Sequence, residues 1–360
     1  MKRRKLASWL LALALIGLGA EVGARLDDWA CAGVPLLASP NRGRDLTLHD
    51  EHGFHGQPNG RFKKWKLNSL GFRSPEASPQ PEPGMKRIVV LGASETFGLY
   101  ETEGMEYPAQ LEAMLKKHHP NVEVQNAAMA GMSLASMKPY WEQWASKAEP
   151  QYVIIYPSPM LYLTDKAPKP PSSEIPALEP LSMTERIRIA PRIRDGVRQA
   201  EWLKPLRQLY FQWKTRTSLA HHSEDGWIWS EPPADRLEQF SEDLRGLVRS
   251  IRAKGAVPML ITHANRSPSP PTSEYLGELE AMRAFYPRAS PQVIAEFEVL
   301  GREAVKRIAR EEVVRCIDAA SKMTDDREAW FADEVHFTDA GARRFADIVA
   351  GALEPVLTGR

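Results

Sequence analysis

A regular alternation of short apolar segments with longer amphipathic ones, starting near residue 86, constrains the fold of this chain most. The apolar segments predict strands at 87–91, 122–125, 152–156, 257–262 and 313–317. The amphipathic ones predict helices at about 107–117, 134–148, 237–253, 291–310 and 339–353, because apolar residues recur there at three- and four-residue steps. Short apolar strands alternating with helices are typical of a mostly parallel sheet covered on both faces. The sequence therefore predicts an α/β fold.

Functional side chains in such a sheet are expected just beyond the carboxyl ends of the strands. Ser94 follows the first predicted strand in the sequence Gly-Ala-Ser, and a loop containing Asn126 and Gly131 follows the second. His263 and Asn265 follow the strand predicted at 257–262. These positions are the first places to look for a site.

Ser94 is either a small residue in a turn or a nucleophile, and a nucleophilic serine needs a base and donors for an oxyanion. Near the C-terminus, "WFADEVHFTDAG" places Asp333 three residues before His336. This spacing suits a loop in which the carboxylate accepts a hydrogen bond from one imidazole nitrogen and leaves the other nitrogen free for a serine. Together these residues favour the nucleophile.

With these motifs in this order, the chain resembles the SGNH hydrolases, the GDSL-type esterase and lipase family, in their exported or membrane-anchored bacterial form. The resemblance covers about residue 86 to the C-terminus. It implies a flavodoxin-like three-layer α/β/α sandwich. It also implies Ser94 as nucleophile, His336 as base, Asp333 as the residue that orients it, and the N–H groups of Ser94 and Gly131 as oxyanion donors.

One motif departs from the family pattern. Where the family usually has Gly-x-Asn-Asp, with the asparagine donating to the oxyanion, this chain has "YPSPMLY" and no asparagine. Ser158 in that stretch is one replacement, and His263 and Asn265 are others. His263, Asn265 and Asn126 are also candidates for binding substrate, although Asn126 better suits a structural role in bonding its own loop, and a histidine such as His263 is more often a satisfied loop residue.

The N-terminus resembles an export signal. A basic start is followed by the uncharged apolar segment 6–20, whose length suits a signal peptide and is short for a membrane span. Residues 1–26 are therefore either a cleaved signal peptide or an uncleaved signal-anchor, held in the inner membrane by 6–24. Both alternatives place the rest of the chain in the periplasm or at the extracellular face.

The remaining chain divides into three parts. Residues 27–84 form an N-terminal extension that ends in a proline-rich linker, and residues 85–360 form the hydrolase domain. Within that domain, the helical and proline-rich segment 165–235 interrupts the strand–helix pattern, and we expect it to be an insertion lying over the sheet.

Charge and cysteine content restrict the partners. Lys and Arg total 47 and Asp and Glu total 46, so the net charge of +1 gives no reason to expect a nucleic acid. Cys31 and Cys316 match no metal-binding motif, and their spacing leaves open whether they pair. We expect no metal and no cofactor, and a substrate that is an acylated small molecule or glycan.

Three functions fit this sequence. The first is a carboxylic-ester hydrolase outside the cytoplasm, acting through an acyl-enzyme on an ester such as an O-acetyl group of a cell-envelope or exopolysaccharide glycan. The second uses the same three residues to transfer the acyl group to a polysaccharide hydroxyl. The third is a catalytically impaired binding or assembly protein, which the missing asparagine favours.

Overall fold

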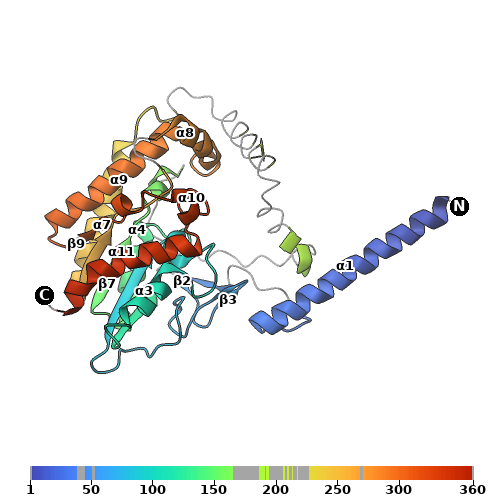
Figure 1. The fold of residues 1–360 in the computed structure, drawn as a ribbon, viewed down its shortest axis with the longest axis horizontal. Helices are drawn as coiled ribbons and strands as arrows, with labels where there is room; N and C mark the ends of the chain where they lie inside the picture. Colours follow the sequence, from blue (N-terminus) through green and yellow to red (C-terminus); the bar gives the residue numbers. More distant parts are fainter. Residues whose placement is uncertain are drawn as a thin grey trace.

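The core of the molecule is a five-stranded parallel sheet (Figure 1). The computed structural model describes residues 2–38, 45–50, 53–164, 186–190, 192–193, 206, 209–210, 213, 217, 227–267 and 271–358 of the 360. The strands are β5 (Lys86–Gly92), β6 (Val122–Asn126), β7 (Tyr152–Tyr156), β8 (Val257–Ile261) and β9 (Arg315–Ile317). Their order, β6-β5-β7-β8-β9, is the flavodoxin-like order, and the direction of winding reverses between β5 and β7.

Helices cover both faces of the sheet (Figure 1). The two core clusters divide them into α3 (Tyr107–Leu115) and α11 (Asp339–Thr358) on one face and α4 (Leu134–Gln143), α7 (Ala234–Ala253) and α9 (Pro291–Glu311) on the other. In β5, Ile88 and Val90 belong to the first cluster and Val89 and Leu91 to the second, as strand alternation requires. The predicted three-layer α/β/α sandwich is confirmed.

Shorter elements complete the described part of the chain. Beside the sheet they include the antiparallel pairs β1–β2 and β3–β4. Their bounds are β1 (Thr47–Asp50), β2 (Gly53–Gly56), β3 (Arg61–Phe62), β4 (Trp65–Lys66), α2 (Ser94–Phe97), η2 (Ala145–Ala148), η3 (Pro159–Leu163), α8 (Ser273–Leu279), η6 (Glu280–Ala284), η7 (Ala320–Lys322) and α10 (Arg327–Trp330).

In two predicted elements a single residue with an unexpected backbone conformation sets the boundary. The helix predicted at 134–148 ends at Gln143, because Trp144 leaves the helical region with φ −130° and ψ −62°, and the short helix η2 follows. The strand predicted at 313–317 begins only at Arg315, because Val313 has a φ of +51°, which a strand does not allow.

The proline-rich segment before β5 packs on the sheet domain instead of linking to it loosely. The buried Arg87 guanidinium donates hydrogen bonds to the carbonyls of Ser78, Pro79 and Ala148, at 2.8, 3.0 and 2.8 Å. The Asn68 amide donates to the Pro75 carbonyl at 3.0 Å. These hydrogen bonds connect residues 68–79 to the sheet domain.

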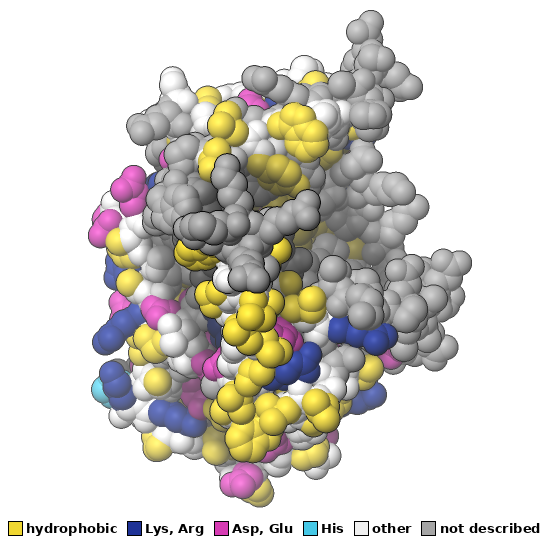
Figure 2. All heavy atoms as spheres, turned by 90° about the vertical axis from the view of Figure 1, so that its right-hand side faces the viewer, with side chains coloured by type: hydrophobic (Ala, Val, Ile, Leu, Met, Phe, Trp, Pro, Cys, Tyr) yellow, Lys and Arg dark blue, Asp and Glu magenta, His cyan; other side chains and the backbone are white. Residues whose placement is uncertain are grey.

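The N-terminal segment is a single helix, α1 (Lys2–Ala32), which projects from the domain (Figure 1). Residues Ser8–Ala30 are long and apolar enough to cross a membrane. Figure 2 views the side toward which α1 projects and shows a column of apolar side chains there. The exposed apolar side chains of α1 include those of Trp9, Leu10, Leu11, Leu13, Leu15 and Ile16.

The helix runs past the predicted apolar segment because its polar residues have partners. Arg25 pairs with Glu21 one turn earlier, at 2.8 Å. The Asp28 carboxylate lies 3.3 Å from Arg188 and 2.7 Å from Arg192, two residues of the predicted insertion. The placement of the insertion over the sheet lies mostly outside the described residues.

Candidate active site

Ser94 stands at the sharp turn that joins β5 to the short helix α2. The turn requires a glycine at position 92, because a Cβ there would lie 2.1 Å from the Thr96 hydroxyl oxygen. Ser94 is the first residue of α2, so its backbone N–H points out of the helix N-terminus. The turn thus presents both the hydroxyl and the N–H of Ser94 at the carboxyl edge of the sheet.

His336 and Asp333 complete a hydrogen-bonded line to Ser94. His336 Nε2 lies 2.8 Å from Ser94 Oγ, and His336 Nδ1 lies 2.7 Å from Asp333 Oδ2. Asp333 Oδ1 also accepts the backbone N–H groups of Val335 and His336, at 3.0 and 2.9 Å. Ser94 and His336, which are 242 positions apart in the sequence, therefore meet in one site with Asp333.

The electrostatics of this line suit a general base. Burial alone would lower the pKa of His336, but the hydrogen bond and charge of Asp333, with the charges of Glu95 and Glu101, raise that pKa above its ordinary value. Burial would raise the pKa of Asp333, but its bonds from His336 outweigh this and lower it. Asp333 is therefore ionised near neutral pH and favours the imidazolium form of His336.

The loop containing Gly131 runs beside the Ser94 turn. The N–H of Ala127 donates to Val90 O at 3.0 Å, and that of Met129 donates to Gly92 O at 3.3 Å. Gly131 has a φ of +80°, which favours glycine. No acceptor in the described part of the chain bonds the N–H of Gly131 or of Ser94. Both groups are therefore available to an oxyanion.

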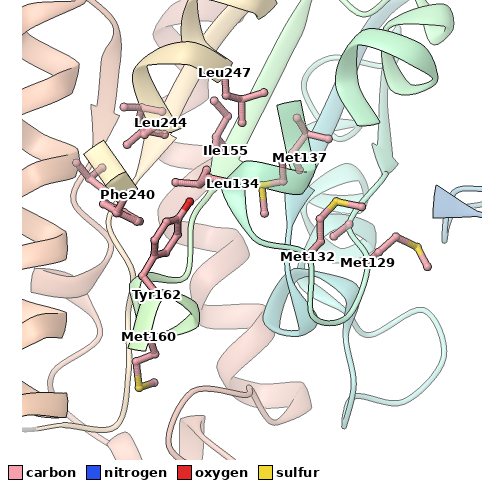
Figure 3. Close-up of a cluster of buried hydrophobic side chains, with 14 of the residues drawn as sticks. Met129, Met132, Leu134, Met137, Ile155, Met160, Tyr162, Phe240, Leu244 and Leu247 are labelled. Carbon is pink, nitrogen blue, oxygen red and sulfur yellow. The ribbon is translucent and has the colours of Figure 1, made fainter. Parts of the chain in front are cut away.

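Ser158 lies at the same edge, on the other side of Ser94. Gly92 is in register with Tyr156 across β5 and β7, so Ser158 comes two residues past that pair. The side chains that fix both loops are visible in Figure 3, where Met129 and Met132 from the Gly131 loop and Met160 and Tyr162 from η3 enter the core. The Tyr162 hydroxyl also donates to Asp243 at 2.6 Å.

Comparison with known proteins finds similarity among solved structures. No family model and no curated protein matches the sequence. A lipase/acylhydrolase from Enterococcus faecalis is 14% identical, covering 76% of this chain and 97% of its own, with a TM-score of 0.43. A catalytic mutant of an acetylxylan esterase from Geobacillus stearothermophilus is 15% identical, covering 74% and 94%, with a TM-score of 0.42. A lipolytic protein of the G-D-S-L family from Desulfitobacterium hafniense is 14% identical, covering 74% and 99%, also at 0.42.

The three candidate substrate-binding residues are buried and bonded within the protein. Asn126 is buried, its amide donates to Thr96 O at 2.9 Å, and its Oδ1 accepts the Ala128 N–H at 3.1 Å. This is the structural role left open above. The buried His263 bonds the carboxylates of Glu95 and Glu298, one with each ring nitrogen. The side-chain oxygen of Asn265 accepts a hydrogen bond from Arg302 at 3.2 Å. Of the proposed replacements for the missing asparagine, Ser158 remains.

The sequence reasoning missed Glu95, which follows the nucleophile directly. Its side chain is 3% exposed, with Oε2 3.4 Å from Ser94 Oγ and Oε1 3.3 Å from His263 Nε2. Glu298 in α9 bonds the other side of His263 at 2.8 Å. The position of His263 after a strand is a signal, but no spacing predicts these partners, which are 168 and 35 residues away. Within the described residues, no group of His, Cys, Asp and Glu suits a metal ion, and Cys316 is a free thiol.

Proposed function

We propose that this chain is a serine esterase of the SGNH type that hydrolyses an acyl ester outside the cytoplasm. The observation that carries the proposal is the line from Ser94 Oγ through His336 to Asp333, with heavy-atom distances of 2.8 and 2.7 Å. Hydrogen bonds of this length connect a nucleophile, a base and an orienting carboxylate in serine hydrolases of several folds.

The reaction proceeds in two halves. Ser94 Oγ attacks the ester carbonyl while its proton moves to His336 Nε2, and Asp333 stabilises the imidazolium that forms. His336 then gives the proton to the departing alcohol. A water molecule, activated by the same imidazole, attacks the acyl-enzyme and releases the acid and free Ser94.

The oxyanion is held by the N–H groups of Ser94 and Gly131, with Ser158 as the third donor. The backbone donors stand at the same sheet edge as the nucleophile, because the Met129 N–H bonds the Gly92 carbonyl and fixes the two loops side by side. A single donor of this kind typically contributes about 100- to 1000-fold to turnover. Two backbone donors therefore retain much of the stabilisation of the oxyanion when the family's asparagine is absent.

The proposal also includes a location outside the cytoplasm and a class of substrate. Helix α1 has a stretch at Ser8–Ala30 that suits a signal or an anchor, which supports export. The ring of Tyr100 is 49% exposed and lies edge-on to His336 at 5.2 Å between centroids. An exposed aromatic ring beside the base suits a sugar, so an O-acyl group on an envelope or extracellular glycan is the proposed substrate.

The test uses the Ser94→Ala variant with p-nitrophenyl acetate and a fluorophosphonate probe. We expect wild-type turnover and labelling, and loss of both in the variant. Ser146→Ala is the matched control, because Ser146 lies in η2, before the start of β7 and so at the opposite edge of the sheet. Turnover that survives in Ser94→Ala contradicts the proposal. A wild-type protein that neither turns over ester nor reacts with the probe favours the binding protein, and acyl transfer to an added glycan favours the transferase.

A further inference from the structure

A second histidine lies buried beneath the nucleophile, in contact with two carboxylates. The His263 side chain is 0% exposed, and those of Glu95 and Glu298 are 3% and 1% exposed. His263 Nε2 lies 3.3 Å from Glu95 Oε1, and His263 Nδ1 lies 2.8 Å from Glu298 Oε2. The cluster joins α2, the loop after β8 and α9, and none of the steps above uses it.

The geometry determines the protonation state of His263. A neutral imidazole carries one N–H, so it could donate to only one of the two carboxylates. The other pair would then place two unprotonated acceptors against each other in a buried site, which is unfavourable. The doubly protonated imidazolium donates to both. His263 is therefore a buried cation between two anions, a charge state that burial without partners would not allow.

The cluster reaches the reacting atoms through Glu95. One oxygen of its carboxylate faces His263, and the other lies 3.4 Å from Ser94 Oγ. Ser94 Oγ is 2.8 Å from His336 Nε2, so the hydroxyl proton is directed to the base, with Glu95 as a more distant second acceptor. The anion of Glu95 is thus held beside both the nucleophile and the imidazole that receives its proton.

On this geometry, and resting on the esterase function proposed above, we infer that Glu95 is a further catalytic residue and that His263 is the positioning residue that keeps it ionised. When the Ser94 O–H bond breaks, the proton passes to His336 and the Oγ–carbon bond forms. Glu95 keeps its charge and His263 keeps both protons throughout. The charge of Glu95 favours the imidazolium of His336, in addition to the effect of Asp333.

Tyrosine side chains pack around the cluster, and Glu101 acts on His336 beside it. The Tyr156 ring from β7 stacks on His263 at 5.3 Å, and burial raises the pKa values of Tyr156, Tyr107 and Tyr286. Glu298 from α9 belongs to the cluster, and Glu101, whose pKa burial raises to about 7, acts on His336 together with Asp333 and Glu95.

The pKa shifts agree in direction with the charges argued from geometry. Burial opposes the charged forms, but mutual bonding lowers the pKa of Glu95 to about 2 and raises that of His263 to about 9. Between these values both residues are charged, so the pair does not itself titrate near neutral pH.

The test is the pH profile of kcat/KM in the Glu95→Gln variant. The base must be neutral to accept a proton, so the acid limb follows the pKa of His336, which lies above its ordinary value. Removing the Glu95 anion lowers that pKa. We expect the acid limb to move to lower pH by about 0.5 to 1 pH unit. We also expect kcat at neutral pH to fall about 10-fold, with KM nearly unchanged. An acid limb at the wild-type position overturns the inference.

The His263→Gln variant tests the positioning role. It leaves Glu95 buried without a cation, so Glu95 takes up a proton and the effect should equal that of Glu95→Gln. The double variant Glu95→Gln/His263→Gln contains no buried unpaired carboxylate at position 95, and its loss of kcat should equal that of either single variant and not their product. Additive losses in the double variant indicate a merely structural role and overturn the assignment of His263.

Glu106→Gln is the matched control. Glu106 is another buried carboxylate, but it contacts Arg73 and the Gly104 N–H and not the triad, so its loss should reduce stability without moving the acid limb. The profile is measured on wild-type protein first. Absence of wild-type turnover contradicts the esterase proposal, whereas an active wild type with unaltered variants contradicts only the role of Glu95.

Discussion

The substitution Asp333→Asn separates the orienting role of Asp333 from its role in holding the loop. In the structure, Asp333 Oδ1 accepts the N–H groups of Val335 and His336 and lies 2.9 Å from His336 Nδ1, whereas Oδ2 has Nδ1 as its nearest partner, at 2.7 Å. An asparagine keeps the first oxygen and its two backbone bonds, so the loop should hold its shape. Its NH₂ group replaces Oδ2 and can only donate toward Nδ1.

This reversal of donor and acceptor places the imidazole proton on the wrong nitrogen. With Nδ1 accepting, the proton of neutral His336 sits on Nε2, which lies 2.8 Å from Ser94 Oγ. Nε2 can then no longer accept the hydroxyl proton. We expect kcat/KM for p-nitrophenyl acetate to fall about 10³- to 10⁴-fold, equivalent to about 4–5.5 kcal/mol of transition-state stabilisation.

The assay compares steady-state kinetics with urea unfolding of the same protein. The free energy of unfolding should change by less than about 1 kcal/mol, because the backbone bonds remain. A loss of activity smaller than 10-fold in a folded Asp333→Asn protein would refute the assignment of Asp333 as the residue that orients His336. A large loss of stability would instead show that the carboxylate mainly holds the loop.

Two further changes probe the surroundings of the triad. Ser158→Ala should lower kcat about 10- to 100-fold with little effect on KM, and unchanged kcat would exclude Ser158 as an oxyanion donor. Arg73→Met should lower the free energy of unfolding by about 3–5 kcal/mol in urea, because buried Arg73 donates to Phe97 O and Gly98 O at the end of α2 and faces Glu106 at 3.2 Å. Arg73→Lys, which keeps the charge, should recover part of that stability, and equal stability of all three proteins would show that the pair contributes nothing.

The fold was predictable because its signal is local. Each strand of the sheet is a short apolar run, and the helices between them carry apolar stripes, so the sequence indicated both element types and the layer arrangement. Breaks that depend on a single backbone conformation were missed. Nothing in the pattern shows that Trp144 leaves the helix or that Val313 takes a positive φ.

The site divides in the same way. Asp333 and His336 share one loop, so their pairing could be inferred from spacing, and the parallel sheet carries them to Ser94. The Glu95–His263–Glu298 cluster could not be inferred, since its members come from three elements and meet only through packing. The position of His263 after a strand makes it a candidate for a site, but its complete burial depends on packing that the pattern does not show.

If the proposed export signal is cleaved, its cleavage and the packing of α1 against Arg188, Ile189 and Arg192 compete for the same residues. Within the segment 1–26, the Ala24 side chain is buried and its carbonyl accepts a bond from Arg192 at 3.0 Å. A peptidase needs an extended, accessible backbone, whereas here the backbone is helical and covered. A chain cut before docking would lose the bond from Ile189 N–H to Glu21 at 2.9 Å. If α1 docks before cleavage, the docked contacts protect it, so under the export proposal the order of these two events decides whether the cleaved or the anchored form results.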